Sequence, residues 1–251
     1  MMTQFSGHQV CYVRTMRTRG LMVALLDVDG TLHPRSIGLT LLDAMMQRGL
    51  GQVAHIVAVM DTVRRYRQRS ILFNEMVHMT SAAYAAALAG VRQSEVQALA
   101  EEIWPALRED LFAFVRPLLA MLHAAEVTPY IISSSPQEIV SLLAAELGVA
   151  DSHGSSFEVV DGRYTGTCLV MPGAPGGKLT LLRRFAAGRA ADLGRSLALG
   201  NGEGDFEVLS EVGRPLLFEP GAHLYTQGAS PAWQQVDRAN LLTHVAQILA
   251  H

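Results

Sequence analysis

The segment Leu25-Leu-Asp-Val-Asp-Gly-Thr-Leu32 overlaps the end of a short, wholly apolar run that occupies residues 21–26. A run of this length favours a central strand of a parallel sheet, because such a strand is buried on both faces. The run stops at Asp27, and a second carboxylate, Asp29, follows two residues later. In open parallel sheets, ligands bind beyond the carboxyl ends of the strands. The segment therefore predicts both a buried strand and the position of a functional site.

Composition and charge narrow the class of protein. The chain has 251 residues, 49% of them hydrophobic, which is enough for one large core or for a core domain with a small satellite. The formal net charge of -3 provides no basic field to collect nucleic acid, so nucleic acid is not an expected partner. No apolar run approaches the ~20 residues that cross a bilayer. We therefore expect no membrane partner and a cytoplasmic location.

Strands and helices alternate along most of the chain. Further apolar runs predict strands over residues 127–132, 196–199 and 214–218. Ser135-Pro-Gln-Glu138 predicts a helix start with Ser135 as the N-cap. The alternation predicts an α/β fold with a doubly wound parallel sheet. The helices are expected over about residues 136–147, 177–193, 205–212 and 237–250.

Two segments depart from this alternation. Asp161-Gly162, within residues 157–166, lies between β-forming residues and predicts a small antiparallel flap. Residues 35–116 contain no convincing strand and show helical apolar spacing, which favours a helical cap inserted over the active site. The predicted division is an N-terminal extension over 1–20, a core over 21–34 and 117–251, and an all-helical cap over 35–116.

Reactive side chains cluster at the predicted strand ends. A carboxylate such as Asp27 can attack phosphorus and form an aspartyl phosphate, while Asp29 can protonate the departing alcohol and then activate water. Mg²⁺ prefers oxygen ligands, and a hydroxyl and an ammonium can hold the remaining phosphate oxygens. The pattern therefore predicts phosphoryl transfer. The other candidates are Gly30, which permits a sharp turn, Ser133 and Ser134 after the second strand, Lys178 before the third, and Asn201, Glu203 and Asp205 after it.

These motifs resemble those of the haloacid dehalogenase (HAD) superfamily. Asp27-Val-Asp-Gly-Thr31 resembles the first motif, Ile132-Ser133 the second, Gly177-Lys178 the third and Gly200-Asn-Gly-Glu-Gly-Asp205 the fourth. The helical insert is similar to a C1 cap. The flap and the Ser-Ser-Pro turn resemble the phosphoserine-phosphatase-like branch, subfamily IB. The resemblance implies an HAD Rossmann-like core and a phosphoric monoester hydrolase that uses Mg²⁺.

The resemblance also implies a role for each matching residue. Asp27 would be the nucleophile and Asp29 the general acid/base, and this second acid favours a phosphatase over a dehalogenase. Ser133 and Lys178 would complete the catalytic set. Phosphate binding would involve Gly30, Ser133, Ser134 and Lys178, and the metal ligands would be Asp27, the backbone carbonyl of Asp29, Asn201 and Asp205.

Two positions depart from the family pattern. Asn201 stands where the family usually has a metal-binding aspartate, and an amide should bind Mg²⁺ more weakly than a carboxylate. Ser36 stands where phosphoserine phosphatases place a glutamate, which disfavours an amino-acid phosphate. The predicted function is a Mg²⁺-dependent phosphatase acting on a small phosphorylated metabolite. The alternatives are a non-catalytic or weakly active relative that binds phosphate ligands, and a phosphotransferase using the same nucleophile.

The predicted cap carries two groups of residues whose role the pattern leaves open. Its arginines, at positions 64, 65, 67 and 69, either form a solvated helix face or include one that binds a second anionic group of the substrate. Its methionines more often fill a core than line a substrate surface. They are Met45, Met46, Met60, Met76 and Met79.

Overall fold

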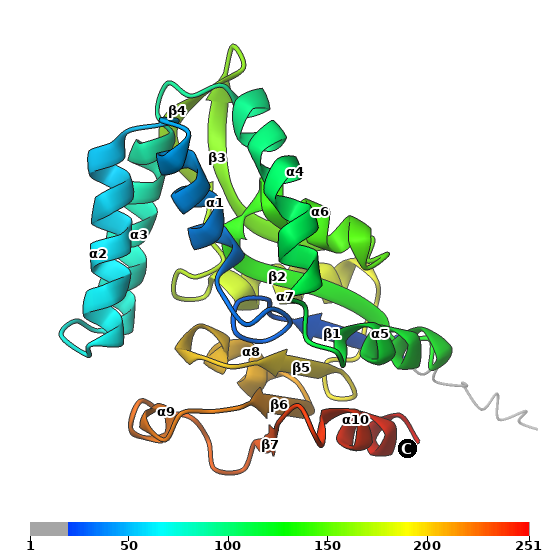
Figure 1. Ribbon diagram of the computed structural model, residues 1–251. Coiled ribbons are helices and arrows are strands. Elements are labelled where there is room, and N and C mark those ends of the chain that lie inside the picture. The colour runs from blue at the N-terminus through cyan, green and yellow to red at the C-terminus, as the bar shows by residue number, and fades with distance from the viewer. Residues whose placement is uncertain (1–19, 251) are drawn as a thin grey trace, which may run out of the picture.

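A single sheet forms the centre of the computed structural model, which describes residues 20–250 (Figure 1). The predicted extension over residues 1–20 therefore falls almost wholly outside the described residues. Neighbouring strands follow the order β4-β3-β2-β1-β5-β6-β7, and all pairs except β3 and β4 are parallel. This arrangement confirms the predicted α/β fold. The strands are β1 (Val23–Leu26), β2 (Thr128–Pro136), β3 (Ser152–Val160), β4 (Arg163–Val170), β5 (Leu197–Gly200), β6 (Arg214–Phe218) and β7 (Gln234–Val236).

Helices occupy most of the remaining described chain. None of them, within residues 20–250, has the length and hydropathy that a membrane crossing requires. The cytoplasmic location stays a prediction. The helices are α1 (Ile37–Gln47), α2 (Val53–Arg67), α3 (Phe73–Leu88), α4 (Gln93–Glu109), α5 (Val115–Ala124), α6 (Gln137–Glu146), α7 (Gly177–Gly188), the 3-10 helix η1 (Glu203–Asp205), α8 (Phe206–Glu211), α9 (His223–Thr226) and α10 (Leu241–Leu249).

The two faces of β1 explain why its sequence is apolar throughout. Successive side chains of a strand point to opposite faces of the sheet. Ala24 and Leu26 enter a core shared with α1, α4, α5, α6 and α10. Val23 and Leu25 enter a second core formed with α7 and α8. Helices cover both faces of β1, so the strand has no solvent-facing side that would favour polar residues.

The end of β2 differs from the prediction. The strand continues through the serine cluster to Pro136, because Pro136 still pairs with Ser155 of β3. The predicted N-cap role of Ser135 is wrong: the cap position of α6 is Pro136, which makes no side-chain cap bond. The Ser135 hydroxyl instead accepts a bond from the Gly38 amide at 2.8 Å and donates to Asp29 at 2.7 Å.

The predicted antiparallel hairpin is present, but it is not an isolated flap. Its turn residues Asp161 and Gly162 have φ of 50° and 74°, the left-handed conformation that an Asp-Gly hairpin turn requires. β3 also pairs in parallel with β2, so the hairpin extends the main sheet. The polar, three-residue strand β7 was not predicted, since Gln234 and Gln235 show no apolar run.

Helices α1 to α4 follow β1 in sequence and match the predicted helical segment within a few residues. α1 and α4 pack together and against α6, whereas α2 and α3 pair with each other and α3 also packs against the edge strand β4 (Figure 1). The segment was predicted to close at Arg116-Pro117, and α5 begins at Val115 with Pro117 in its first turn, where proline is tolerated. The division into core and cap stays a prediction.

Replacing Leu25 tests the double-sided burial of β1. Leu25 has no exposed surface, and a leucine-to-alanine change at such a site removes apolar contacts and leaves a cavity. We expect Leu25→Ala to lower the free energy of unfolding by about 2–5 kcal/mol in urea titrations. Leu169, which is 60% exposed on the edge strand β4, provides the control. Equal losses in Leu25→Ala and Leu169→Ala would contradict this packing.

Candidate active site

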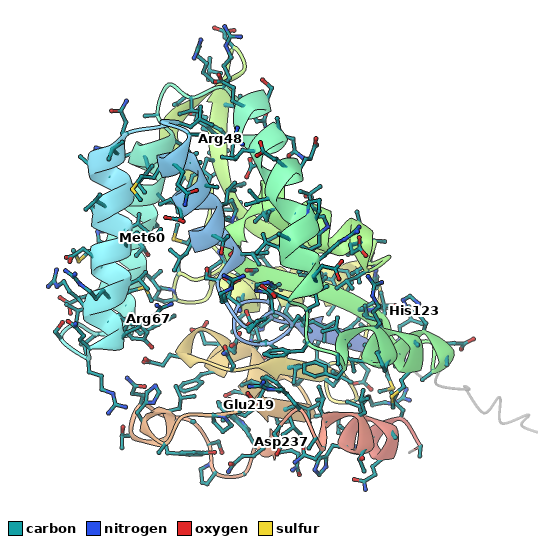
Figure 2. The ribbon with its side chains drawn as sticks, viewed as in Figure 1. Arg48, Met60, Arg67, His123, Glu219 and Asp237 are labelled. Carbon is teal, nitrogen blue, oxygen red and sulfur yellow. The ribbon has the colours of Figure 1, made fainter. Side chains whose placement is uncertain are left out.

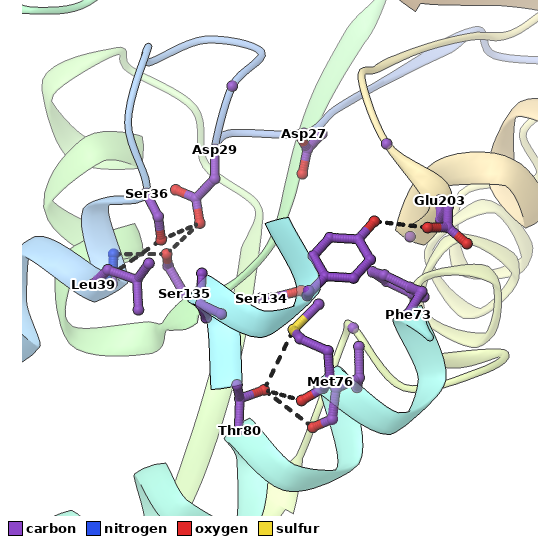
Figure 3. Close-up of a pocket in the computed structure, with 18 of the residues that line it drawn as sticks. Asp27, Asp29, Ser36, Leu39, Phe73, Met76, Thr80, Ser134, Ser135 and Glu203 are labelled. Atoms are coloured by element: carbon purple, nitrogen blue, oxygen red, sulfur yellow. Dashed lines mark hydrogen bonds between the residues drawn. The ribbon is translucent and has the colours of Figure 1, made fainter. Parts of the chain in front are cut away.

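A cavity of about 900 Å³ lies between the carboxyl ends of the parallel strands and helices α2 and α3 (Figure 3). Its position agrees with the rule that ligands bind at this edge of an α/β sheet. One side is polar and comes from the segments that follow β1 and β5, from the end of β2 and from the start of α7. The residues of that polar side are Asp27, Asp29, Gly30, Ser134, Ser135, Lys178, Asn201, Gly202, Glu203 and Asp205.

Lys178 joins two buried carboxylates at the polar end of this cavity. Its Nζ lies 2.5 Å from Asp27 Oδ1 and 2.6 Å from Asp205 Oδ1, and the side chain is only 4% exposed. Thr31 donates its hydroxyl to the other oxygen of Asp27 at 2.6 Å. The structure thus brings together three predicted site residues from β1, α7 and the segment after β5. It also adds Thr31, which was predicted only as part of the first motif.

Composition also singles out Lys178. It is the single lysine of the chain, and the other 19 of the 20 lysine and arginine residues are arginines. Lysine presents a compact point charge, while arginine presents a broad planar fork. A compact charge can contact Asp27 and Asp205 at once, as the Lys178 ammonium does. The single lysine therefore marks a special position.

Burial strongly affects the ionisation of the Asp27–Lys178 pair. Desolvation, reinforced by the negative charge of Asp205, raises the pKa of Asp27 to about 7, although Lys178 and Thr31 oppose the shift. Burial alone would lower the pKa of Lys178, but attraction to Asp205 and Asp27 outweighs it and raises that pKa. Lys178 therefore stays protonated, and the carboxylates outnumber it. The surplus negative charge would favour binding of a cation.

Asp29 is oriented by three hydrogen bonds. Ser36 and Ser135 donate their hydroxyls to Asp29 Oδ2 at 3.0 and 2.7 Å, and the Ile37 amide donates to Oδ1 at 3.0 Å. Burial raises the pKa of Asp29, and these hydrogen bonds counteract part of the rise. Figure 3 shows the two serines converging on the carboxylate. This role is not visible in the sequence, because Ser36 also caps α1 and local patterns reveal only capping.

Asn201 packs directly against Gly30. A Cβ on Gly30 would lie 2.0 Å from Asn201 Nδ2, and Gly30 has φ +84°, so any side chain would be both crowded and strained. Asp205 Oδ2 accepts the amides of Asn201 and Gly202 at 3.0 and 3.1 Å and thereby holds this segment. Among residues 20–250, no three His, Cys, Asp or Glu side chains are grouped to hold a metal. A metal here would also need amide and carbonyl oxygens.

The two predicted phosphate-binding serines occupy different environments. Ser133 is fully buried, does not line the cavity, and accepts a hydrogen bond from the Ser135 amide at 3.0 Å. Ser134 is exposed and lines the cavity beside Gly173. Their assignment to phosphate stays a prediction.

Helices α2 and α3 contact the segment after β5 on one side of the cavity. Tyr66 donates its hydroxyl to Glu203 at 2.7 Å, as Figure 3 shows, and the Phe73 ring lies against Gly204. Of the predicted arginine cluster, Arg67 lines the cavity, and Arg64 pairs with Asp61. Met60 and Met76 also line the cavity, whereas Met45 is buried in the core, as predicted. Figure 2 labels Met60 and Arg67 on α2.

The fold agrees with comparisons to known proteins. The family model described as haloacid dehalogenase-like hydrolase matches residues 24–210, and the chain belongs to this family. A phosphoserine phosphatase of Streptomyces coelicolor is 25% identical over 203 residues, which cover 81% of this chain and 45% of that protein. The chain spans about half the length of the first curated relatives it matches.

Solved structures show the same fold at lower sequence identity. A protein of unknown function from Bordetella pertussis Tohama I superposes with a TM-score of 0.70 and 23% identity, covering 87% of this chain and 99% of the other. A phosphoserine phosphatase described as a phospho-aspartyl intermediate analogue gives a TM-score of 0.65 and 15% identity, covering 90% and 99%. These likenesses show the fold, and together with the family match they confirm the predicted HAD Rossmann-like core.

Because Lys178 is the only lysine, amine acetylation can report on its environment. At pH 8 we expect no acetylation of Lys178 in the folded protein, since the 4% exposed ammonium stays protonated. In urea, Lys178 should react. Mass spectrometry of peptides reads this site, and a lysine-containing peptide added to the same reaction controls for reagent activity. Similar modification of Lys178 in folded and unfolded protein would contradict its buried ion pairs.

Proposed function

We propose that this protein is a Mg²⁺-dependent phosphatase that hydrolyses a small phosphomonoester through an aspartyl phosphate on Asp27. The proposal depends above all on the buried Asp27, which Lys178 contacts at 2.5 Å in the cavity and which is followed two residues later by Asp29. Membership of the family and the phosphoserine phosphatases among the similar proteins support it.

The chain's own residues provide a balanced sequence of steps. An Asp27 oxygen attacks phosphorus, the bond to the alcohol oxygen breaks, and Asp29 gives its proton to the leaving alkoxide. Asp29, now a carboxylate, takes a proton from water as that water attacks the aspartyl phosphate. Phosphate leaves and the Asp27 carboxylate is restored. Ser36 and Ser135 hold Asp29 in place for both proton transfers.

Lys178 has two tasks in this scheme. Its ammonium favours the ionised form of Asp27, which is the form that attacks phosphorus. It can also pair with a phosphate oxygen as charge moves from the leaving group. Its bond to Asp205 fixes the ammonium on the side of the cavity where α7 begins.

Residues with oxygen donors suited to Mg²⁺ line the same cavity. The Asp27 carboxylate, the Asp29 carbonyl and the Asn201 amide oxygen would hold the ion, with Asp205 near enough to contribute. Asp205 already binds Lys178 and two backbone amides, so its main contribution would be charge. When bound, Mg²⁺ would neutralise charge on the phosphoryl group.

Helices α2 and α3 would act as the cap of this site. They line the side of the cavity facing Asp27 and Asp29 and contact the segment after β5 through Tyr66 and Phe73. A cap in this position would limit water around the phosphoryl group and select the leaving group.

Replacing the nucleophile tests the proposed chemistry. With Mg²⁺ present, we expect Asp27→Asn to lower kcat on phosphomonoesters by on the order of 10³-fold or more, because an amide cannot form the acyl phosphate. The control is Asp161→Asn at the hairpin turn, where asparagine tolerates the same positive φ. Release of inorganic phosphate is the measurement. Undiminished turnover by Asp27→Asn would rule out this nucleophile, and a wild type that binds phosphate without turnover would favour a non-catalytic relative.

Asn201 allows a test of the metal assignment. Asn201→Asp adds a charge to the ligand set without adding bulk beside Gly30. We expect the Mg²⁺ concentration for half-maximal activity to fall by roughly tenfold, because Mg²⁺ binds carboxylates more strongly than amides. Asn240→Asp, at the N-cap of α10, is the matched control. An unchanged Mg²⁺ requirement in Asn201→Asp would remove Asn201 from the ligand set.

A further inference from the structure

We propose that the alcohol portion of the substrate is a bulky, uncharged, apolar group, aromatic or branched aliphatic, that packs against α2 and α3. The proposal rests on the proposed function, because it concerns the leaving group of the same phosphate ester. Two features of the cavity carry it: the apolar side chains of the two helices and the volume.

One continuous face of each helix lines the cavity. On α2 the apolar members are Val59, Met60 and Val63, at the spacing that places residues on one side of a helix. On α3 they are Phe73, Met76 and Val77, again one turn apart. Figure 3 shows Phe73 and Met76 directed into the pocket.

These side chains are not simply the buried core of the helix pair. Met60, Val63, Phe73 and Met76 each keep part of their surface exposed, while Ile56 on α2 is fully buried. Phe157 and Met171, which come from β3 and the loop before α7, add apolar surface to the cavity. An apolar ligand group would remove this exposed surface from water, which is the favourable change in apolar binding.

Glu219, one of the acidic residues that line the cavity away from Asp27, is neutralised by Arg238 at 2.7 and 2.9 Å. Glu203 accepts the Tyr66 hydroxyl at 2.7 Å and Asp43 accepts the Gln47 amide at 2.8 Å, and both of these donors are neutral. A substrate ammonium bound by Glu203 or Asp43 is an opposing outcome that O-phosphoserine tests below.

The basic residues on the same lining give little support for a second anion. Arg35 pairs with Asp110, and Lys178 is held between Asp27 and Asp205. Arg67 is exposed at the end of α2, beyond the apolar side chains. An anionic tail reaching Arg67 is the opposing outcome that the experiment below resolves.

The volume fits a group larger than a two- or three-carbon alcohol. At about 900 Å³ the cavity falls near the upper end of the range of ~300–1,000 Å³ typical of pockets that enclose drug-sized ligands. A short polar alcohol would leave the side chains of α2 and α3 in contact with water.

Four alkyl phosphates with similar leaving alcohols test the proposal with Mg²⁺ present: ethyl phosphate, 2-phenylethyl phosphate, O-phosphoserine and the phosphate ester of 3-hydroxypropanoate. We expect kcat/KM for 2-phenylethyl phosphate to exceed that for ethyl phosphate by at least about tenfold, because apolar contacts discriminate on this scale. O-phosphoserine and the carboxylated ester should not exceed ethyl phosphate. Preference for either charged ester would overturn the proposal.

Paired methionines on α3 provide matched variants. Met76→Gln keeps the side-chain length but makes the cavity surface polar, and we expect it to lower kcat/KM for 2-phenylethyl phosphate by about tenfold and that for ethyl phosphate by less than about twofold. Met79 lies on the same helix, is 39% exposed and does not line the cavity, so Met79→Gln should change neither value. Met60→Gln on α2 repeats the test independently. Equal losses on both esters would overturn the proposal.

A binding measurement separates this inference from the proposed function. If no ester is turned over, the phosphatase assignment fails, whereas the apolar site is still tested by calorimetry with 2-phenylethyl phosphate and ethyl phosphate. We expect at least about tenfold tighter binding of the phenyl ester. Equal Kd values would overturn the apolar site.

Discussion

The ammonium of Lys178, held between Asp27 and Asp205, is the interaction on which the site depends. A charge taken out of water is costly unless it is paired, and here three charged groups are buried together. The pairing requires β1, the start of α7 and the segment after β5 to meet. Asp205 adds to this by binding two backbone amides of that segment. Asp205 therefore fixes both the backbone of the segment after β5 and the position of the Lys178 ammonium.

Around this buried group, the two sides of the cavity have different physical characters. The polar side is built from strand ends whose backbone is fixed by the sheet and by the close contact of Gly30 with Asn201. The other side comes from α2 and α3, which pair with each other and contact the polar side through Tyr66 and Phe73. Proton and phosphoryl transfer need reactive groups that are held rigidly in place. The strand ends provide these groups, while α2 and α3 provide the surface against which a leaving group would pack.

Much of this arrangement was predictable because short-range patterns carry it. The apolar run before Asp27 predicted β1, and turn chemistry at Asp161-Gly162 predicted the hairpin. The functions of Ser36 and Ser135 were not predictable, because a serine beside a helix start looks like a cap whichever group it bonds. Nor did the sequence distinguish buried Ser133 from exposed Ser134, since that depends on how β2 twists past its neighbours.

By itself, the sequence determined the α/β class, the ends of β1, β5 and β6 to within one residue, and the reactive residues that follow β1 and β5. These depend on local hydrophobic pattern and on residue type, which are properties of neighbours in the chain. Only the tertiary structure decided that Lys178 bridges Asp27 and Asp205, that two serines hold Asp29, and that Met60 and Met76 face a cavity. Each of these contacts joins residues on different elements of the fold, and their distances follow from sheet order and helix packing, which no local pattern encodes.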